Sequence, residues 1–166
     1  MAWTLSGSPA TACGRDGEHC GNNRAIGSTS VPGLPAKPII DIDVLLSKDR
    51  SLIEATRCLA RLGYTHEGDL GIPGREAFKA LKNDPLHHLY VCIPGSKEFE
   101  RHLAFRNYLR ANPADARIYG ELKKSLAMKF REDRGAYTAR KSAIVASLTD
   151  RAFEQIENLL SNLEAR

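Results

Sequence analysis

The sequence predicts an α/β or α+β domain, in which a small mixed β-sheet is flanked by helices and the C-terminal half is helical. Two observations predict this class. Two apolar runs bounded by turn residues, KPIIDIDVLL at 37–46 and HHLYVCI at 87–93, have the composition of β-strands. Beyond residue 97 the apolar residues recur instead with the 3.6-residue period of helices. The sheet is therefore expected mainly in the first half of the chain.

The N-terminal part of the chain is predicted to lack regular structure. Residues 1–24 are rich in Gly, Ser, Ala, Thr and Asn and show neither period, which is typical of a flexible or divergent arm. The domain proper is assigned to residues 25–166. A turn leads into the strand at 37–46, which we expect to be central; it is built from Pro32, Gly33, Pro35 and Pro38.

The helix expected at 49–62 carries its apolar residues near one face, at Leu52, Ile53, Thr56, Leu59, Ala60 and Leu62. Asp49 is the predicted N-cap and Gly63 the predicted C-cap. A short strand at 64–68 and a turn at 69–74 follow.

Three further helices are predicted, at 97–112, 113–130 and 136–163. Pro113 suits the first turn of the second of these helices. The third is long, and we expect its apolar stripe to consist of Ile144, Val145, Leu148, Ala152, Phe153, Ile156, Leu159, Leu160 and Leu163.

Composition limits the classes of function. With 166 residues, 42% hydrophobic and 27% charged, the chain has the make-up of one globular domain rather than a disordered one. Its net charge of +4 is the excess of 24 Lys and Arg, spread along the chain, over 20 Asp and Glu. This mild excess suits phosphate-bearing ligands, and nucleic-acid binding is not favoured. No window of about 18 apolar residues occurs, so no membrane span is expected.

The four cysteines favour a reducing, cytoplasmic location. They form no CxxC pair, and Cys58 and Cys92 lie in apolar surroundings that suit buried, reduced thiols. Cys13, His19 and Cys20 have irregular spacing, so a zinc site there is disfavoured.

Asp41 and Asp43 are the first candidates for chemistry. Side chains alternate across a strand, so carboxylates at i and i+2 share one face. Mg²⁺ is commonly held by one or two carboxylates together with substrate phosphates. A surface strand can carry Asp-x-Asp by chance, but here the neighbouring residues are apolar, and acids in such a strand are costly unless they are paired or bind a metal.

The turn before this strand has the composition of a phosphate cradle. Gly27, Ser28, Thr29 and Ser30 offer backbone N–H groups and hydroxyls with little steric bulk. Any turn can contain Gly-Ser, so the evidence lies in the combination of Gly-Ser, about a dozen residues, and Asp-x-Asp.

That combination resembles the nucleotidyltransferase superfamily of the polymerase-beta type, whose signature is a Gly-Ser or Gly-Gly turn followed by Asp-x-Asp. The string IGSTSVPGLPAKPIIDIDV narrows the resemblance to the GrpB family, nucleotidyltransferase-like proteins of largely unassigned activity. HHLYVC, HLAFRNYLRANPADARIYGELKKSLA and AYTARKSAIV extend it, so that it covers roughly residues 26–146.

The resemblance implies a nucleotidyltransferase-like fold and a metal-dependent transfer of a nucleotidyl group from a nucleoside triphosphate to an unknown acceptor, a small molecule or a protein. By motif position, Asp41 and Asp43 would be the catalytic ligands of Mg²⁺ or Mn²⁺, and Gly27, Ser28 and Ser30 would contact phosphates. We add Lys37 as a further candidate phosphate contact, although it is equally a solvated lysine.

Four other residues are candidate neighbours of the site. His88 matches a histidine of the family; it is either at the site or hydrogen-bonded structurally. Arg75 and Arg106 could bind phosphate bidentately, or could pair with Glu76 and Glu100. The fourth is Asn107, which stands where the family commonly has Asp.

Two departures from the superfamily leave a second reading open. The strand at 87–93 carries no third carboxylate, and Asn107 cannot supply the negative charge of an aspartate. In this second reading the chain is a catalytically impaired binding or accessory module. Because GrpB-like domains also occur fused to dephospho-CoA kinase, as the resemblance implies, that module could be linked to coenzyme A metabolism.

Overall fold

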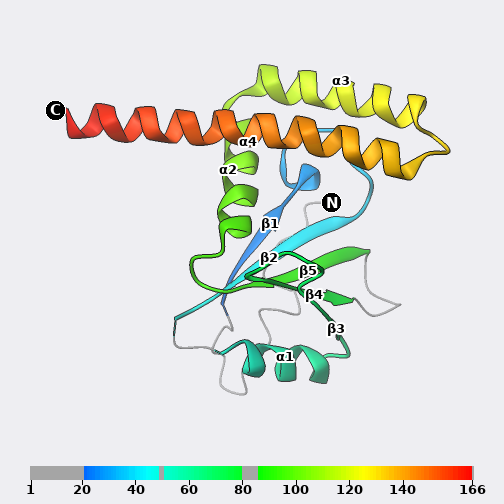
Figure 1. Cartoon of the computed structure of the whole chain (residues 1–166), viewed down its shortest axis with the longest axis vertical. Coiled ribbons are helices and arrows are strands. Elements are labelled where there is room, and N and C mark those ends of the chain that lie inside the picture. The colour runs from blue at the N-terminus through cyan, green and yellow to red at the C-terminus, as the bar shows by residue number, and fades with distance from the viewer. Residues whose placement is uncertain (1–20, 49–50, 80–85, 166) are drawn as a thin grey trace. The chain divides into compact units, whose positions relative to one another are not determined.

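The computed structural model describes residues 21–48, 51–79 and 86–165 (Figure 1). The chain divides into two units, one of Met1–Ser30 with Lys37–Glu100 and the other of Val31–Ala36 with Arg101–Arg166. The predicted arm at residues 1–20, with Cys13, His19 and Cys20, lies outside the described residues. Each unit is described in turn below.

The first unit is built on a five-stranded mixed sheet, which confirms the predicted class. Its strands are β1 (Gly21–Ile26), β2 (Ile40–Leu46), β3 (Thr65–Gly68), β4 (Arg75–Lys79) and β5 (His87–Cys92). They lie in the order β1-β2-β5-β4-β3, with β2 and β5 parallel and the other pairs antiparallel. β2 therefore has a neighbour on each side, as expected of the strand that carries Asp-x-Asp.

Two strands were not predicted. Residues 21–24, which we expected to belong to the arm, are part of β1 and pair with β2 from Gly21↔Leu46 to Ile26↔Asp41. β4 was predicted as no element at all. Both strands are short and rich in polar residues, so their own sequences carry little strand signal; pairing with β2 and β5 stabilises them instead.

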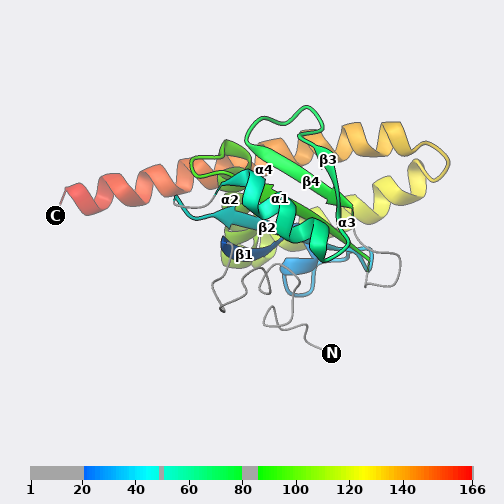
Figure 2. The same ribbon diagram turned by 90° about the horizontal axis from the view of Figure 1, so that it is seen from below.

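One face of the sheet is covered by α1 (Leu52–Arg61), as Figure 2 shows. Alternate residues of β2 point to this face, and Ile42, Val44 and Leu46 are all at most 3% exposed. They pack in the core of the unit with Ala55, Leu59, Tyr64, Phe78, Leu89 and Val91. The odd-numbered residues of β2, including Asp41 and Asp43, must then lie on the opposite face.

The first turn of α1 differs from the prediction. Its N-cap is Ser51 rather than Asp49, which lies outside the described residues. Ser51 Oγ accepts a hydrogen bond from the Glu54 backbone N–H at 3.2 Å, and Glu54 Oε2 accepts one from the Ser51 N–H at 3.1 Å. This capping box satisfies two helix-terminal N–H groups at once. At the other end Leu62 is the C-cap, and Gly63 follows it with a φ of 86°.

Ser51→Ala is expected to lower the free energy of unfolding by about 1 kcal/mol, because it removes a capping oxygen from an exposed helix terminus. Ser47→Ala, at an exposed position that caps no helix, is the matched control and should change it by less than about 0.5 kcal/mol. Urea denaturation measures both. Equal losses for the two variants would contradict the assignment of Ser51 as the cap.

The second unit is helical, as the period of its sequence predicts. It contains the greater part of α2 (Lys97–Ala111), together with α3 (Pro113–Lys129) and α4 (Arg134–Glu164). α3 and α4 run side by side (Figure 1), and α3 has Pro113 in its first turn, as predicted. The core of this unit includes Phe105, Leu109, Tyr119, Leu148 and Ala152.

The predicted apolar stripe of α4 is buried only in part. Leu148 and Ala152 pack in the core of the second unit, with Ile144, Val145 and Phe153 against it. The last turns are exposed despite the continuing helical period, at Ile156, Leu159, Leu160 and Leu163. Periodicity predicted the helix correctly, but it did not predict where the buried contacts end.

The two cysteines in the described part of the chain differ in covalent state. Cys92 carries a free, buried thiol, as expected. Cys58 is disulfide-bonded, so the prediction of a reduced thiol was wrong for this residue, and the cysteines give less support to a cytoplasmic location. Within the described ranges, no helix has the length and apolar character needed to cross a membrane.

Candidate functional site

The face of the sheet opposite α1 gathers the predicted carboxylates. In the register of β2 and β5, Asp41 lies opposite His88 and Asp43 opposite Tyr90. On the other side of β2, Asp43 lies opposite Arg24 of β1. Residues paired in this way project from the same face of a sheet. We call this surface the polar face and define it by Arg24, Asp41, Asp43, Arg75, His88 and Tyr90.

The two carboxylates have different environments. Asp43 is fully buried, with 0% exposure, whereas 32% of the Asp41 side chain is exposed. The negative charge of Asp43 acts on its surroundings: together with burial, which is the larger cause, it raises the pKa of the nearby Cys92 thiol to about 12. A wholly buried carboxylate next to a second one is costly to maintain, so this arrangement is unusual for a strand with only a structural role.

His88 contacts Asp41 directly. Its Nδ1 lies 2.9 Å from Asp41 Oδ1, and because an ionised carboxylate can only accept, the ring donates this hydrogen bond. The neighbouring His87 faces the core instead, where its Nε2 lies 2.8 Å from the Tyr64 hydroxyl. His87 is therefore hydrogen-bonded in the core, whereas His88 contacts one of the candidate ligands on the polar face.

The Gly-Ser turn lies against the other oxygen of Asp41. Gly27 has a φ of 68°, and a Cβ built there would stand only 2.4 Å from Asp41 Oδ2. Glycine alone meets both conditions, since it tolerates positive φ and lacks the clashing atom. The turn continues as η3 (Ser28–Ser30), whose Ser30 Oγ donates to the Gly27 carbonyl at 2.7 Å. The predicted phosphate turn and the predicted metal ligand are thus neighbours in space.

Lys37 is exposed and stands three residues before Ile40, the first residue of β2. Its backbone carbonyl accepts a hydrogen bond from the Ile39 N–H at 2.8 Å. These contacts favour neither the phosphate-binding reading nor the solvated one.

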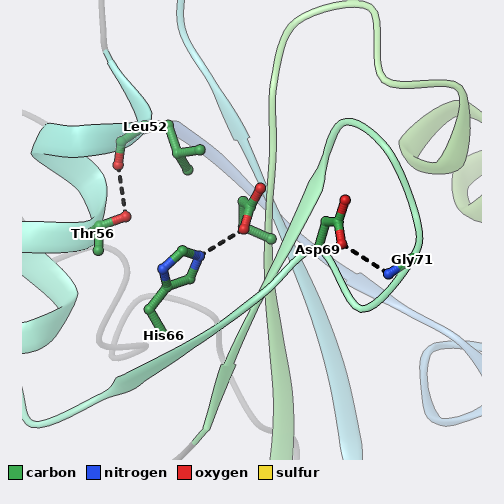
Figure 3. Close-up of polar contacts among 6 residues, drawn as sticks. Leu52, Thr56, His66, Asp69 and Gly71 are labelled. Atoms are coloured by element: carbon green, nitrogen blue, oxygen red, sulfur yellow. Dashed lines mark hydrogen bonds and ion pairs between the residues drawn. The ribbon is translucent and has the colours of Figure 1, made fainter.

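Arg75 is on the polar face and is buried, with only 8% exposure. Its guanidinium carbon lies 4.2 Å from the centre of the Tyr90 ring, which is a cation–π contact. The alternative reading, an ion pair with Glu76, was wrong. Glu76 points to the opposite face, where its Oε2 lies 2.6 Å from His66 Nε2, the contact drawn from His66 in Figure 3.

Tyr90 is a residue that sequence reasoning missed. Burial raises the pKa of its hydroxyl; Arg75 opposes this effect, and the carboxylates of Asp41, Asp43 and Glu67 add to it. The hydroxyl is therefore close to both kinds of charge. The signal was present in the sequence, because Tyr90 follows His88 by two residues and must share its face.

No third acid joins the pair in the described part of the chain. Within residues 21–48, 51–79 and 86–165, no group of three or more His, Cys, Asp and Glu could hold a metal ion. Glu67 acts electrostatically on Tyr90 and Glu98 on Cys92, and Glu100 is exposed. Two carboxylates with a glycine turn beside them still fit Mg²⁺, which takes hard oxygen ligands and commonly completes its shell with water and substrate phosphates.

Arg106 and Asn107 lie on α2 in the second unit. Arg106 donates from both Nε and Nη2 to Asn107 Oδ1, at 3.0 Å and 2.9 Å. Asn107 itself is exposed. Asn107 thus accepts hydrogen bonds from the arginine next to it, a role that its neutral amide can fill.

Comparisons with known proteins agree with this fold. Residues 13–151 match the family described as GrpB protein. The chain is 36% identical over 127 residues to the UPF0157 protein YqkA of Bacillus subtilis, and 38% identical over 133 residues to a UPF0157 protein of Pseudomonas aeruginosa. These matches cover 76% of this chain but only 37% and 53% of the two relatives.

Two further matches cover most of this chain and most of the matched protein. The glutamate-rich protein GrpB of Alkalihalophilus pseudofirmus is 37% identical, over 78% of this chain and 77% of the relative. The crystal structure of the conserved protein GrpB from Enterococcus faecalis is similar, with a TM-score of 0.71, 37% identity and 81% of each chain covered. The chain therefore belongs to the GrpB family.

Proposed function

We propose that this protein is a metal-dependent nucleotidyltransferase that moves a nucleotidyl group from a nucleoside triphosphate to the hydroxyl of an acceptor. The observation that carries the proposal is the position of the Gly27 backbone against the Asp41 carboxylate, on the same face as the buried Asp43. A ligand that bears both phosphates and a divalent cation would contact the turn and the carboxylates together.

Each residue of the site has a role in this proposal. Asp41 and Asp43 would hold Mg²⁺ or Mn²⁺, which when bound offsets phosphate charge and lowers the pKa of an attacking hydroxyl. His88 holds Asp41 in place through the 2.9 Å hydrogen bond, as outer-shell groups commonly do for ligating carboxylates. The backbone of Gly27 and the residues Ser28 and Ser30 would contact the phosphates, with Lys37 as a further candidate.

The reaction would be an in-line displacement. The acceptor oxygen forms a bond to the α-phosphorus, the bond from that phosphorus to the bridging oxygen breaks, and pyrophosphate leaves with the electron pair. The acceptor proton passes to water. The residues of the polar face contribute by positioning and by electrostatic stabilisation.

A second function is favoured by one observation: among the described residues, no third acid joins Asp41 and Asp43 in a group that could hold a metal ion. In this function the protein binds a nucleotide with its cation but does not turn it over, and serves as an accessory module. The two functions share one binding site and differ only in turnover.

We expect a nucleoside triphosphate with Mg²⁺ to raise the melting temperature of the protein, because a ligand at about 100 times its Kd stabilises the folded state by about 2.7 kcal/mol. The double variant Asp41→Asn, Asp43→Asn should lose this shift. Thermal unfolding with each of the four triphosphates, with and without Mg²⁺, measures it.

Asp69→Asn is the matched control for this experiment. Asp69 lies in an exposed turn, where its Oδ1 accepts a hydrogen bond from the Gly71 N–H at 2.9 Å (Figure 3), and Asn can accept the same bond. This variant should keep the full shift. If none of the four triphosphates shifts the wild-type protein, the nucleotide site is refuted. A shift without pyrophosphate release across a screen of acceptors would favour the accessory module.

A further inference from the structure

Arg75 stands out on the polar face because its charge is buried and, in the part of the chain that the structure describes, is not neutralised by a direct ion pair. The residue is 8% exposed, and its Nε is a buried atom without a hydrogen-bond partner. Its positive charge rests on the Tyr90 ring, 4.2 Å away. Considering residues 21–48, 51–79 and 86–165 alone, no carboxylate forms an ion pair with it.

A guanidinium in this state is suited to bind an anion. Taking an arginine out of water is costly, and a cation–π contact offsets only part of that cost. Its planar fork of donors matches the oxygens of a carboxylate or a phosphate, which would restore the missing hydrogen bonds. Stacking on Tyr90 holds the plane of the fork before any ligand arrives, so little conformational entropy is lost on binding.

The position of Arg75 in the sheet indicates which substrate it would contact. The Gly-Ser turn contacts β1 and β2, whereas Arg75 is on β4, two strands beyond β2 in the order β1-β2-β5-β4-β3. β2 and β4 are two strand spacings apart, about 10 Å, and the register sets Arg75 level with Cys92 and Leu45, two residues beyond Asp43 along β2. On β2, Asp41 is the carboxylate beside the turn and Asp43 is the one nearer in register to Arg75, with Tyr90 opposite Asp43 on β5.

An in-line displacement places the attacking and the leaving oxygens on opposite sides of the phosphorus. If the β- and γ-phosphates lie over the Gly-Ser turn, pyrophosphate leaves on the β1 side of the carboxylates. The acceptor must then arrive from the β5 and β4 side, where Arg75 lies.

We propose that Arg75, stacked on Tyr90, binds an anionic group of the acceptor, a carboxylate or a phosphate. This inference rests on the proposed function, and it narrows the acceptor to molecules that carry a negative charge near the reacting hydroxyl. The Tyr90 hydroxyl, on the same face, is a second candidate donor to that anion.

The test is a titration of the 166-residue chain, followed through the Arg Nε–H signals in a ¹H–¹⁵N NMR spectrum. The Arg75 signal is the one absent from Arg75→Lys. The protein is first saturated with Mg²⁺ and a triphosphate that has a methylene group between the α- and β-phosphorus atoms. Inorganic phosphate and acetate are then added in separate experiments. We expect one of them to shift the Arg75 signal saturably, and the anion that does so identifies the acceptor's charged group.

Variants give the size of the effect. Arg75→Lys should weaken binding of the effective anion about 10- to 100-fold, because bidentate charge-assisted hydrogen bonds are lost. Arg57→Lys, at an exposed arginine of α1, is the matched control and should leave the affinity unchanged. Tyr90→Phe keeps the stacked ring, removes only the hydroxyl, and should weaken the anion less than Arg75→Lys does.

Each other outcome overturns the inference in a recognisable way. If the Arg75 signal moves when the triphosphate binds and neither small anion moves it further, Arg75 belongs to the triphosphate site. If nothing moves it although the triphosphate raises the melting temperature, Arg75 is structural and the proposed function stands. If a small anion moves it but no triphosphate binds, the anion site has no link to an acceptor and the proposed function fails.

Discussion

Gly27→Ala is expected to lower the free energy of unfolding by about 1.5–3 kcal/mol and to remove the stabilisation by Mg²⁺ and a triphosphate. A non-glycine residue at a φ of 68° costs about 1–2 kcal/mol. The added Cβ would also stand 2.4 Å from Asp41 Oδ2, so the carboxylate must move. That movement breaks its partly exposed contact with His88, worth about 0.5–1 kcal/mol.

Gly71→Ala is the matched control for this substitution. Gly71 also has a positive φ, 78°, but a Cβ there meets no heavy atom within 4 Å. It should therefore show the cost of strain alone, about 1–2 kcal/mol, and keep the response to the triphosphate. Urea denaturation and thermal shift measure the two effects. A Gly27→Ala protein that still responds fully would show that close approach of the turn to Asp41 is not needed.

Cys92 is expected to react with iodoacetamide at pH 8 about 1,000-fold more slowly in the folded protein than in the urea-unfolded chain. Burial, and after it the charge of Asp43, raise the pKa of its thiol from 9.0 to about 12, and the reactive thiolate falls about tenfold for each pH unit below the pKa. The thiol is also fully buried, which acts in the same direction.

The raised pKa of Cys92 has a defined sign for stability. Because the folded state favours the neutral thiol, this contribution to stability is complete below about pH 9 and is lost as the pH rises from there through about 12.

The same labelling experiment tests the charge at position 43. Asp43→Asn should lower the pKa of Cys92 and speed its alkylation, since Asp43 is the largest of the charges acting on this thiol. Glu98→Gln, which removes the carboxylate with a smaller influence, should speed it less. Mass spectrometry of the Cys92 peptide gives the rates. Equal acceleration by both variants would contradict an ionised Asp43 close to Cys92.

Much of the fold could be predicted because its strongest elements carry local signals. β2 and β5 are apolar runs bounded by turn residues, and the three C-terminal helices follow the 3.6-residue period with Pro113 at one start. β1 and β4 carry no such signal and form because neighbouring strands supply hydrogen bonds. The capping oxygen of α1 was misplaced by two residues, since Asp49 and Ser51 are equally good caps by residue type.

In the candidate site, too, only the features that depend on neighbouring residues in the chain could be predicted. Alternation along a strand places Asp41 and Asp43 on one face, and the structure confirms this. Which residues meet them depends on strand order and register. Arg75 is 32 residues from Asp43 in the chain, and only the pairing of β4 with β5 and of β5 with β2 brings it to the same face.

The sequence by itself determined the family, the position of the Gly-Ser turn and the carboxylate pair, because these features depend on residues close together in the chain. Only the tertiary structure decided that the turn lies against Asp41, that His88 rather than His87 contacts it, and that Arg75 is buried on Tyr90 with no carboxylate of the described residues paired to it. The physical reason is that burial and charge pairing are properties of packed neighbours, and those neighbours are set by the order and register of the strands.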